Sequence, residues 1–156
     1  MQTIEDLIAQ APVFGGLEPG QLKLIAGCGR NEHVAGGSFL FREGEPASRF
    51  FLIRRGSVAI EVQAPGRGAL TIETLHAGDT AGISWLFEPY RWQLDARALE
   101  PSELIGFDAV CLRGKVEADH ELGYELMRRF TANLADRLQA TRFQLLDVYG
   151  HAPASA

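Results

Sequence analysis

Residues 37–47 read GSFLFREGEPA, and residues 50–58 read FFLIRRGSV. Both stretches place short apolar or aromatic runs between glycines, a pattern typical of short β-strands separated by sharp turns. It predicts strands over residues 39–41, 49–54 and 58–62, with a tight hairpin at Arg55-Gly56 between the last two. We expect the second of these strands to be buried on both faces, because its four central residues are all apolar.

Further runs of the same kind follow downstream. Residues 70–72 alternate with polar neighbours between glycine-containing turns at 65–68 and 76–79. Residues 92–98 alternate again, and residues 103–107 form the last predicted strand. Many short strands without intervening helices predict an antiparallel β-roll of the jelly-roll type rather than a parallel sheet.

Helical patterns flank the predicted roll on both sides. Residues 3–10 and 18–27 predict two short N-terminal helices. After the roll, residues 108–116 predict one helix, and Asp119 is a suitable N-cap for a long second helix that runs to Tyr149.

Two glycines bear on the bounds of the long helix. Gly150 suits the position just past its end, whereas Gly123 weakens its first turns and favours a later start. The predicted fold class is therefore mainly β with α, a β-roll flanked by N-terminal helices and a long C-terminal helix. Its parts are the N-terminal helices (1–28), the β-roll (29–107), the C-terminal helices (108–149) and a tail (150–156).

An apolar stripe runs along the predicted long helix with a mean spacing of about 3.5 residues, which indicates a coiled-coil seam. The stripe is longer than a small β-roll can cover, which favours a second helix as its partner. The alternative is that it packs on the chain's own roll. The members of the stripe are Met127, Phe130, Leu134, Leu138, Thr141, Leu145 and Val148.

Composition and charge indicate a globular domain and argue against a membrane-spanning or nucleic-acid-binding protein. The chain has 156 residues, 46% of them apolar, and a formal net charge of −5. This suits one globular domain, and its scattered basic residues are poorly arranged to neutralise nucleic-acid phosphates. No apolar run reaches the length of a membrane span, and the acidic N-terminus lacks the basic region of a secretory signal. We expect a cytoplasmic protein.

The cysteines, histidines and other residues that could act in catalysis or bind a metal do not form a recognisable motif. Cys28 and Cys111 lack C-x-x-C spacing and stand among apolar neighbours, so we interpret them as small buried thiols, with a redox role as the alternative. The histidines are scattered without an H-x-H pair, and no P-loop or nucleophile–base spacing is present. We expect no metal, no cofactor and no enzymatic activity.

The glycine-punctuated segment resembles the cyclic nucleotide-binding domain, particularly that of the CRP/FNR regulators. The resemblance rests on residues 37–47, 50–58 and 75–79 and on Gly82, and it extends over residues 12–149. Another β-roll, such as a cupin, is the alternative, and the lack of clustered metal-binding residues argues against it. The resemblance implies a regulatory sensor domain that forms a parallel dimer through its long helix.

In that family the ligand lies against a cassette that follows a Gly-Asp turn. A short helix presents N–H groups to the phosphate, a Glu holds the ribose, and an Arg followed by a small hydroxyl residue holds the phosphate. The matching cassette here is residues 78–94, in which Gly82 fits the pattern. The Glu position falls on Ile83, the Arg position on Trp92 and the hydroxyl position on Gln93. Because both charge-assisted contacts are lost, we expect cAMP binding to be weak or absent.

Aromatic residues in the cassette, Trp85, Phe87, Tyr90 and Trp92, allow three interpretations. They are core residues, they line a pocket for a different ligand, or they form an exposed patch for a partner protein. Strand parity puts Trp92 inside the roll and Arg91 outside, unless a bulge shifts the register. The candidate ligand residues are Gly82, Ile83, Ser84, Trp85, Arg91, Trp92 and Gln93.

Together these patterns predict a stand-alone homodimeric sensor that binds a cyclic nucleotide or another small ligand and acts through an unknown protein partner. The alternatives are an interaction module whose pocket is plugged by Trp92, and a CRP/FNR-type transcription regulator. In CRP-like regulators a DNA-binding winged helix follows the long helix, and none fits before Ala156. We expect no direct DNA binding if the chain is complete, whereas a fragment of a longer regulator lifts that exclusion.

Overall fold

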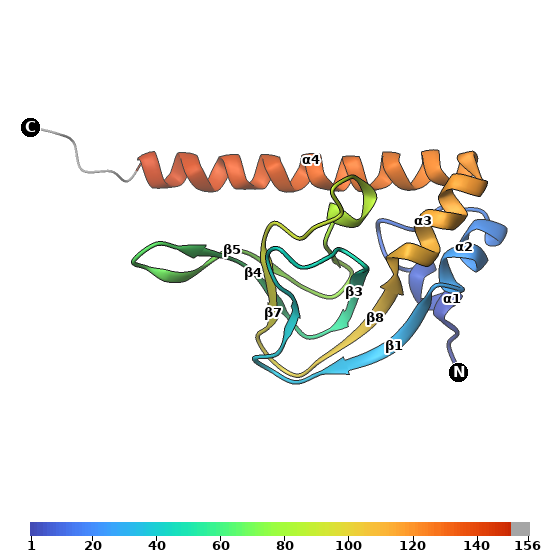
Figure 1. The fold of residues 1–156 in the computed structure, drawn as a ribbon, viewed down its shortest axis with the longest axis horizontal. Coiled ribbons are helices and arrows are strands. Elements are labelled where there is room, and N and C mark those ends of the chain that lie inside the picture. Colours follow the sequence, from blue (N-terminus) through green and yellow to red (C-terminus); the bar gives the residue numbers. More distant parts are fainter. Residues whose placement is uncertain (151–156) are drawn as a thin grey trace, which may run out of the picture.

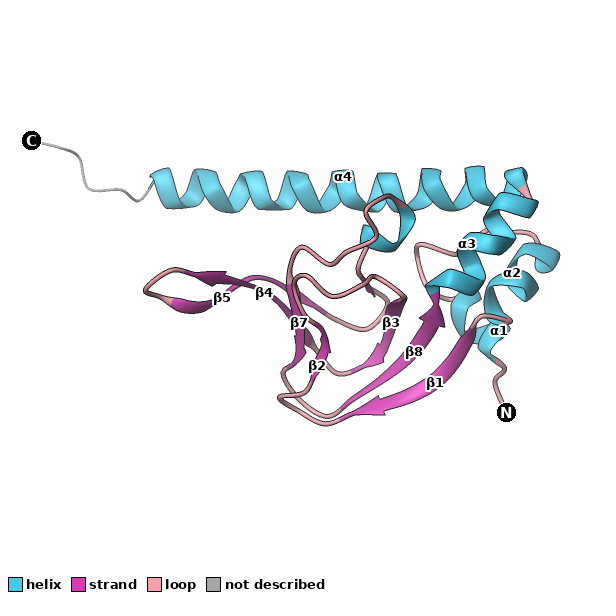
Figure 2. Ribbon diagram, in the orientation of Figure 1, coloured by secondary structure: helices cyan, strands magenta, loops and turns pink. Residues whose placement is uncertain are grey.

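The computed structural model describes residues 1–150, which form two four-stranded antiparallel sheets flanked by helices (Figure 1; Figure 2). The first sheet has the strand order β1-β8-β3-β6, and the second has the order β2-β7-β4-β5. This architecture confirms the predicted jelly roll. The strands are β1 (Gly29–Val34), β2 (Phe39–Phe41), β3 (Arg49–Arg55), β4 (Val58–Ala64), β5 (Gly68–Leu75), β6 (Thr80–Ala81), β7 (Asp95–Ala98) and β8 (Ser102–Asp108).

The helices of the described residues also follow the predicted order. Thr3 caps the first helix by accepting the Asp6 N–H at 3.1 Å, and Asp108 caps the third by accepting the Cys111 N–H at 3.0 Å. Figure 1 shows α1, α2 and α3 gathered at one end of the roll. The helices are α1 (Ile4–Ala9), α2 (Pro19–Ala26), the 3-10 helix η1 (Ser84–Leu86), α3 (Ala109–Ala118) and α4 (His120–Gly150).

The predicted hairpin at Arg55-Gly56 is wrong, because β3 and β4 lie in different sheets. β3 pairs with β6 and β8, whereas β4 pairs with β5 and β7. Gly56 has φ +102°, and a Cβ there would overlap Ser102. The glycine therefore turns the chain from one sheet to the other at a close approach to the neighbouring backbone.

Burial of β3 is as predicted. Phe50, Phe51, Leu52 and Ile53 are each 4% exposed or less, so this strand is covered on both faces. The sequence pattern does not predict β1, whose residues GRNEHV are mostly polar. That strand lies at the edge of the first sheet, where it pairs only with β8.

A cluster of aromatic rings forms the centre of the core. Phe130 of α4 packs edge-on against Phe50 and Trp85, with ring centroids 5.9 and 5.5 Å apart. Phe50 also stacks on Trp85 at 4.2 Å and on Phe107 at 4.6 Å. Phe14 completes the cluster at 6.1 Å from Phe130. Edge-on and stacked geometries of this kind stabilise packing beyond the burial of apolar area alone.

The start of α4 confirms Asp119 as its N-cap, with the Asp119 carboxylate accepting the Leu122 N–H at 3.1 Å. The later start suggested by Gly123 is wrong. A Cβ at Gly123 would lie 2.8 Å from Cγ1 of Val116, so α4 packs on α3 too closely for a larger residue. At the other end, Gly150 is the last residue of α4 rather than the position beyond it, and residues 151–156 of the predicted tail lie outside the described residues.

The buried carboxylates in the second sheet accept hydrogen bonds from donors that lie next to them in the fold but far away in the sequence. Glu61, whose side chain is 3% exposed, accepts hydrogen bonds from Nε and Nη2 of Arg97 at 2.9 and 2.8 Å. These bonds hold the pKa of Glu61 below its usual value, although burial acts in the opposite direction. Asp95 accepts the Glu43 N–H at 2.7 Å and Nε2 of Gln63 at 3.2 Å.

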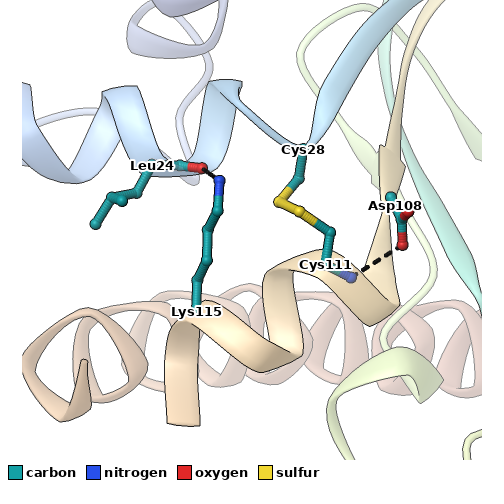
Figure 3. The surroundings of a disulfide bond; sticks show 5 residues. All are labelled: Leu24, Cys28, Asp108, Cys111 and Lys115. Carbon is teal, nitrogen blue, oxygen red and sulfur yellow. Dashed lines mark hydrogen bonds between the residues drawn. A yellow bond between two sulfur atoms is a disulfide. The ribbon is translucent and has the colours of Figure 1, made fainter. Parts of the chain in front are cut away.

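A disulfide joins Cys28, between α2 and β1, to Cys111 in the first turn of α3 (Figure 3). The interpretation of these residues as free thiols is therefore wrong, because the fold brings their Cα atoms within 5.9 Å across 83 positions of sequence. Nζ of Lys115 donates to the Leu24 carbonyl at 2.7 Å between the same segments. Disulfides persist mainly in oxidising compartments. The bond thus weighs against the cytoplasmic location, which stays a prediction.

We expect Cys111→Ser to lower the thermal stability of the domain. A native disulfide stabilises by about 2–4 kcal/mol, which corresponds to a fall in Tm of about 5–15 °C for a chain of this size. Calorimetry of the oxidised wild type and of the variant measures this difference.

The Cys28→Ser/Cys111→Ser double variant is the matched control, because added reductant should lower the Tm of the wild type but not that of the double variant. Equal Tm values for wild type and Cys111→Ser would contradict a stabilising disulfide.

Candidate functional site

The cassette, residues 78–94, forms one wall of a cavity of about 380 Å³. This segment leaves the first sheet at β6, makes the short turn of η1 and enters the second sheet at β7. The loop that carries η1 reaches α4, which runs along the roll (Figure 1). The cavity therefore lies between the second sheet, the cassette and α4, and part of it is open to solvent.

Apolar side chains dominate the wall of this cavity. The lining also includes three uncharged polar side chains, those of Ser84, Gln93 and Thr141. A volume of this size lies at the small end of the range for ligand sites, and an apolar lining with a few polar groups is their usual composition. The apolar lining residues are Phe41, Ile60, Ile83, Phe87, Trp92, Leu94, Leu134 and Leu138.

Trp92 occupies the place beside Gly82. Its indole stacks on Phe41 with ring centroids 3.8 Å apart and an interplanar angle of 12°, and the residue is 4% exposed. Gly82 has φ +102°, and a Cβ there would overlap the six-membered ring of the indole. The indole thus lies directly over the backbone of Gly82, where the resemblance leads us to expect a phosphate.

The charged residues of the lining are Glu73 of β5 and Arg137 of α4, and they bind each other. Nε of Arg137 donates to both carboxylate oxygens of Glu73 at 3.0 Å, and Nη2 donates to Oε2 at 2.7 Å. About a quarter of the Arg137 side chain and a third of the Glu73 side chain are exposed. This bidentate ion pair connects the β4–β5 hairpin to α4 at the cavity. Because the two charges cancel, the lining has no net charge.

Two of the seven candidate ligand residues lie away from the cavity lining. Trp85 is fully buried in the aromatic core, where it stacks on Phe50. Arg91 points to the chain's own backbone, with Nη1 donating to the Gly44 carbonyl at 2.8 Å. Neither side chain is therefore placed to contact a molecule in the cavity. The candidates that the structure brings together are Gly82, Ile83, Ser84, Trp92 and Gln93.

The aromatic residues of the cassette divide among the interpretations. Trp85 belongs to the core, and Trp92 both packs in the core and lines the cavity. Phe87 lines the cavity and is 43% exposed. Tyr90 lies under the guanidinium of Arg113, 4.2 Å from its ring centroid.

Sequence reasoning missed the contribution of α4 to the cavity. The predicted apolar stripe includes Leu134, Leu138 and Thr141, and the sequence gives no role to Arg137. All four line the cavity because α4 crosses the open side of the roll. Spacing along a helix identifies a shared face, but it does not identify which neighbour that face contacts.

Residues 31–119, more than half of the chain, match the family described as the cyclic nucleotide-binding domain. The chain belongs to this family. It is also 26% identical over 145 residues to the CRP-like cAMP-activated global transcriptional regulator of Mycobacterium tuberculosis. That alignment covers 93% of this chain and 63% of the regulator, so the chain spans less than two thirds of the length of this relative.

Solved structures of the family share the fold. A protein of Geobacter metallireducens GS-15 that is assigned as cyclic nucleotide-binding has a TM-score of 0.78 and 28% identity, over 88% of this chain and 99% of that one. The catabolite activator protein of Thermus thermophilus has a TM-score of 0.70 over 89% of this chain and 63% of its own. Its identity of 21% supports the fold alone.

These matches place the chain in a regulatory, ligand-binding family rather than a catalytic one. The resemblance to CRP-type regulators in the sequence analysis is thereby confirmed. Among the described residues, no helix combines the length and the apolar character that crossing a bilayer requires.

The contact between Gly82 and Trp92 gives a test of the site geometry. Gly82→Ala should destabilise the domain by about 2–4 kcal/mol, because the added Cβ meets the indole and the φ angle is unfavourable for alanine. Urea unfolding of the variant and of the wild type measures the loss.

Gly66→Ala is the matched control, because Gly66 has φ +76° and open space around its Cβ position. Its loss should be limited to the backbone cost of about 1–2 kcal/mol. Equal losses for the two variants would contradict the close contact between Gly82 and Trp92.

Proposed function

We propose that this chain is the sensor domain of a dimeric regulator, and that its cassette does not bind cAMP with the affinity usual for the family. The observation that carries the proposal is the cavity between the cassette and α4. A molecule in this cavity contacts the helix that we assign to the dimer interface. Binding in the cavity therefore changes the surface of α4 that is available to a partner. A ligand shifts an equilibrium between two conformations in this way when it binds one of them more tightly.

The altered cassette supports weak cAMP binding. Ile83 and Trp92 stand where the family has its ribose-binding Glu and phosphate-binding Arg, and both of these side chains line the cavity. A hydrogen bond to a charged group contributes about 1.5–3 kcal/mol. Losing two such bonds costs about two to four orders of magnitude in affinity, which would turn a micromolar binder into a millimolar one.

The exposed stripe on α4 supports a dimer. Met127, Leu134, Leu138, Leu145 and Val148 are each between 44% and 69% exposed. The C-terminal half of α4 runs past the compact part of the roll, and of the strands only the β4–β5 hairpin extends as far alongside it (Figure 1). Apolar side chains at coiled-coil spacing on such a helix favour a second helix.

Phe130 is left out of the proposed interface, because it is 2% exposed and packs in the aromatic core. Thr141 stays in the interface as the polar member of the seam. The members Leu134, Leu138 and Thr141 also line the cavity, so the two proposed binding events meet on one face of α4.

A second candidate function is an interaction module that binds no small ligand. The stack of Trp92 on Phe41 favours it, because the indole fills space that the family leaves for a ligand. The proposed partner is then a protein that contacts the dimer. A DNA-binding segment beyond these residues would make the chain part of a transcription regulator, in line with its mycobacterial relative.

Cyclic nucleotides provide the first test. We expect cAMP, cGMP and cyclic di-GMP at micromolar concentrations to leave the Tm unchanged in a thermal-shift series, because the anion contacts are missing. A ligand at about 100 times its Kd adds about 2.7 kcal/mol, or roughly 5–10 °C for a chain of this size. A shift of that size with micromolar cAMP would contradict the proposed weak binding, and AMP is the control for effects unrelated to the cyclic phosphate.

Light scattering tests the dimer. We expect the wild type at about 50 µM to have the mass of a dimer, and Leu145→Glu to have that of a monomer, because the charge falls in the apolar seam. Leu146→Glu is the matched control, since Leu146 is 64% exposed but lies off the seam and should leave the dimer intact. A monomeric wild type, or two variants with the same effect, would contradict the proposed interface.

A further inference from the structure

We infer that the cavity between the cassette and α4 takes an uncharged, predominantly apolar small molecule rather than a phosphate ester. This inference rests on the proposed function, in which the cavity is a ligand site. It adds the chemical class of the ligand, which follows from three features of the cavity: its covered backbone, its paired charges and its apolar wall.

The backbone of Gly82, at the turn that precedes η1, is covered on its Cβ side by an aromatic ring. A phosphate at the start of a short helix needs free N–H groups pointing at it. Here the Trp92 indole lies against Gly82 so closely that a Cβ there would overlap the ring. The indole is held in place by its stack on Phe41 at 3.8 Å. A charged oxygen would have to displace this buried ring to reach Gly82 from that side.

The cations near the cassette are already engaged. Arg137 binds both carboxylate oxygens of Glu73, and Arg91 donates to the Gly44 carbonyl. Arg113 donates to the carbonyls of Ala47 and Trp85 at 3.2 and 2.8 Å. An anion that enters the cavity loses part of its hydration without gaining a free cation in exchange. The cavity is therefore selective against negative charge.

The remaining wall favours apolar surface. The side chains of Ile60, Leu94, Leu134 and Leu138 enclose the space together with Phe87. An apolar ligand gains affinity in proportion to the area it buries against them. Ser84 and Gln93 are left to hydrogen-bond one or two neutral polar groups of such a ligand. The Thr141 hydroxyl donates to the Arg137 carbonyl at 2.9 Å and is left only as an acceptor.

A matched pair of fluorescent probes tests the inference on the whole chain. N-phenyl-1-naphthylamine is an uncharged apolar aromatic, and 8-anilinonaphthalene-1-sulfonate has the same ring system with one added sulfonate. We expect the uncharged probe to bind once per chain with enhanced fluorescence, and the sulfonate to bind at least about tenfold more weakly. Equal or tighter binding of the sulfonate would overturn the inference.

Variants locate the probe. Ile83→Glu puts a carboxylate in the wall and should weaken binding of the uncharged probe at least about tenfold. Leu99→Glu is the charge-matched control, because Leu99 is 45% exposed and lies outside the cavity lining, and it should leave binding unchanged. Phe87→Ala, at a 43% exposed position of the lining, is a second test that does not depend on a buried charge being tolerated. Phe87→Ala should weaken binding several-fold.

Leu145→Glu separates the cavity from the exposed stripe on α4. Retained binding in this variant, with an affinity changed only by the loss of the dimer, supports the cavity, whereas loss of binding there but not in Ile83→Glu places the probe on the stripe and overturns the inference. Displacement of the uncharged probe by micromolar cAMP would overturn the ligand class while leaving the sensor function in place. Absence of probe binding together with no nucleotide response would remove the ligand site itself and with it both proposals.

Discussion

The edge-on packing of Phe130 against Phe50, Trp85 and Phe14 joins three parts of the chain that are distant in sequence. Through this single side chain α4 is fixed to the first sheet, to the cassette and to the segment that follows α1. Together with the Arg137–Glu73 ion pair, this anchor holds α4 over the cavity, where Leu134, Arg137 and Leu138 form part of the lining. The disulfide and the Lys115–Leu24 hydrogen bond hold the neighbouring α3 against α2 in the same region.

In the cassette an aromatic ring covers the turn that precedes η1. Gly82 has a positive φ, and the side of its backbone where a Cβ would stand faces the indole ring of Trp92. Stacking on Phe41 buries both rings and stabilises the indole in this position. The domain thus keeps a cavity while its polar anchor points are reduced to a few neutral side chains.

Strands and helices could be predicted where the local sequence pattern determines them. Examples are the apolar run of β3 and the N-cap of α4 at Asp119. Sequence reasoning failed where a contact depends on tertiary arrangement. Arg55-Gly56 has the chemistry of a hairpin, but local residues cannot say that the next strand joins the other sheet. Nothing near Cys28 or Cys111 indicates that the two meet. The family pattern predicts that the cassette contributes to a ligand site. The contribution of α4 could not be predicted, because no local pattern shows where the helix runs relative to the roll.

Leu134, Leu138 and Thr141 belong both to the cavity wall and to the apolar stripe of α4. Two binding events that share side chains are coupled in free energy, and the coupling is reciprocal: each event changes the equilibrium constant of the other by the same factor. For the proposed dimer, an affinity measured for the cavity therefore depends on the total protein concentration. Measurements at nanomolar and at micromolar protein would give different apparent dissociation constants for the same ligand.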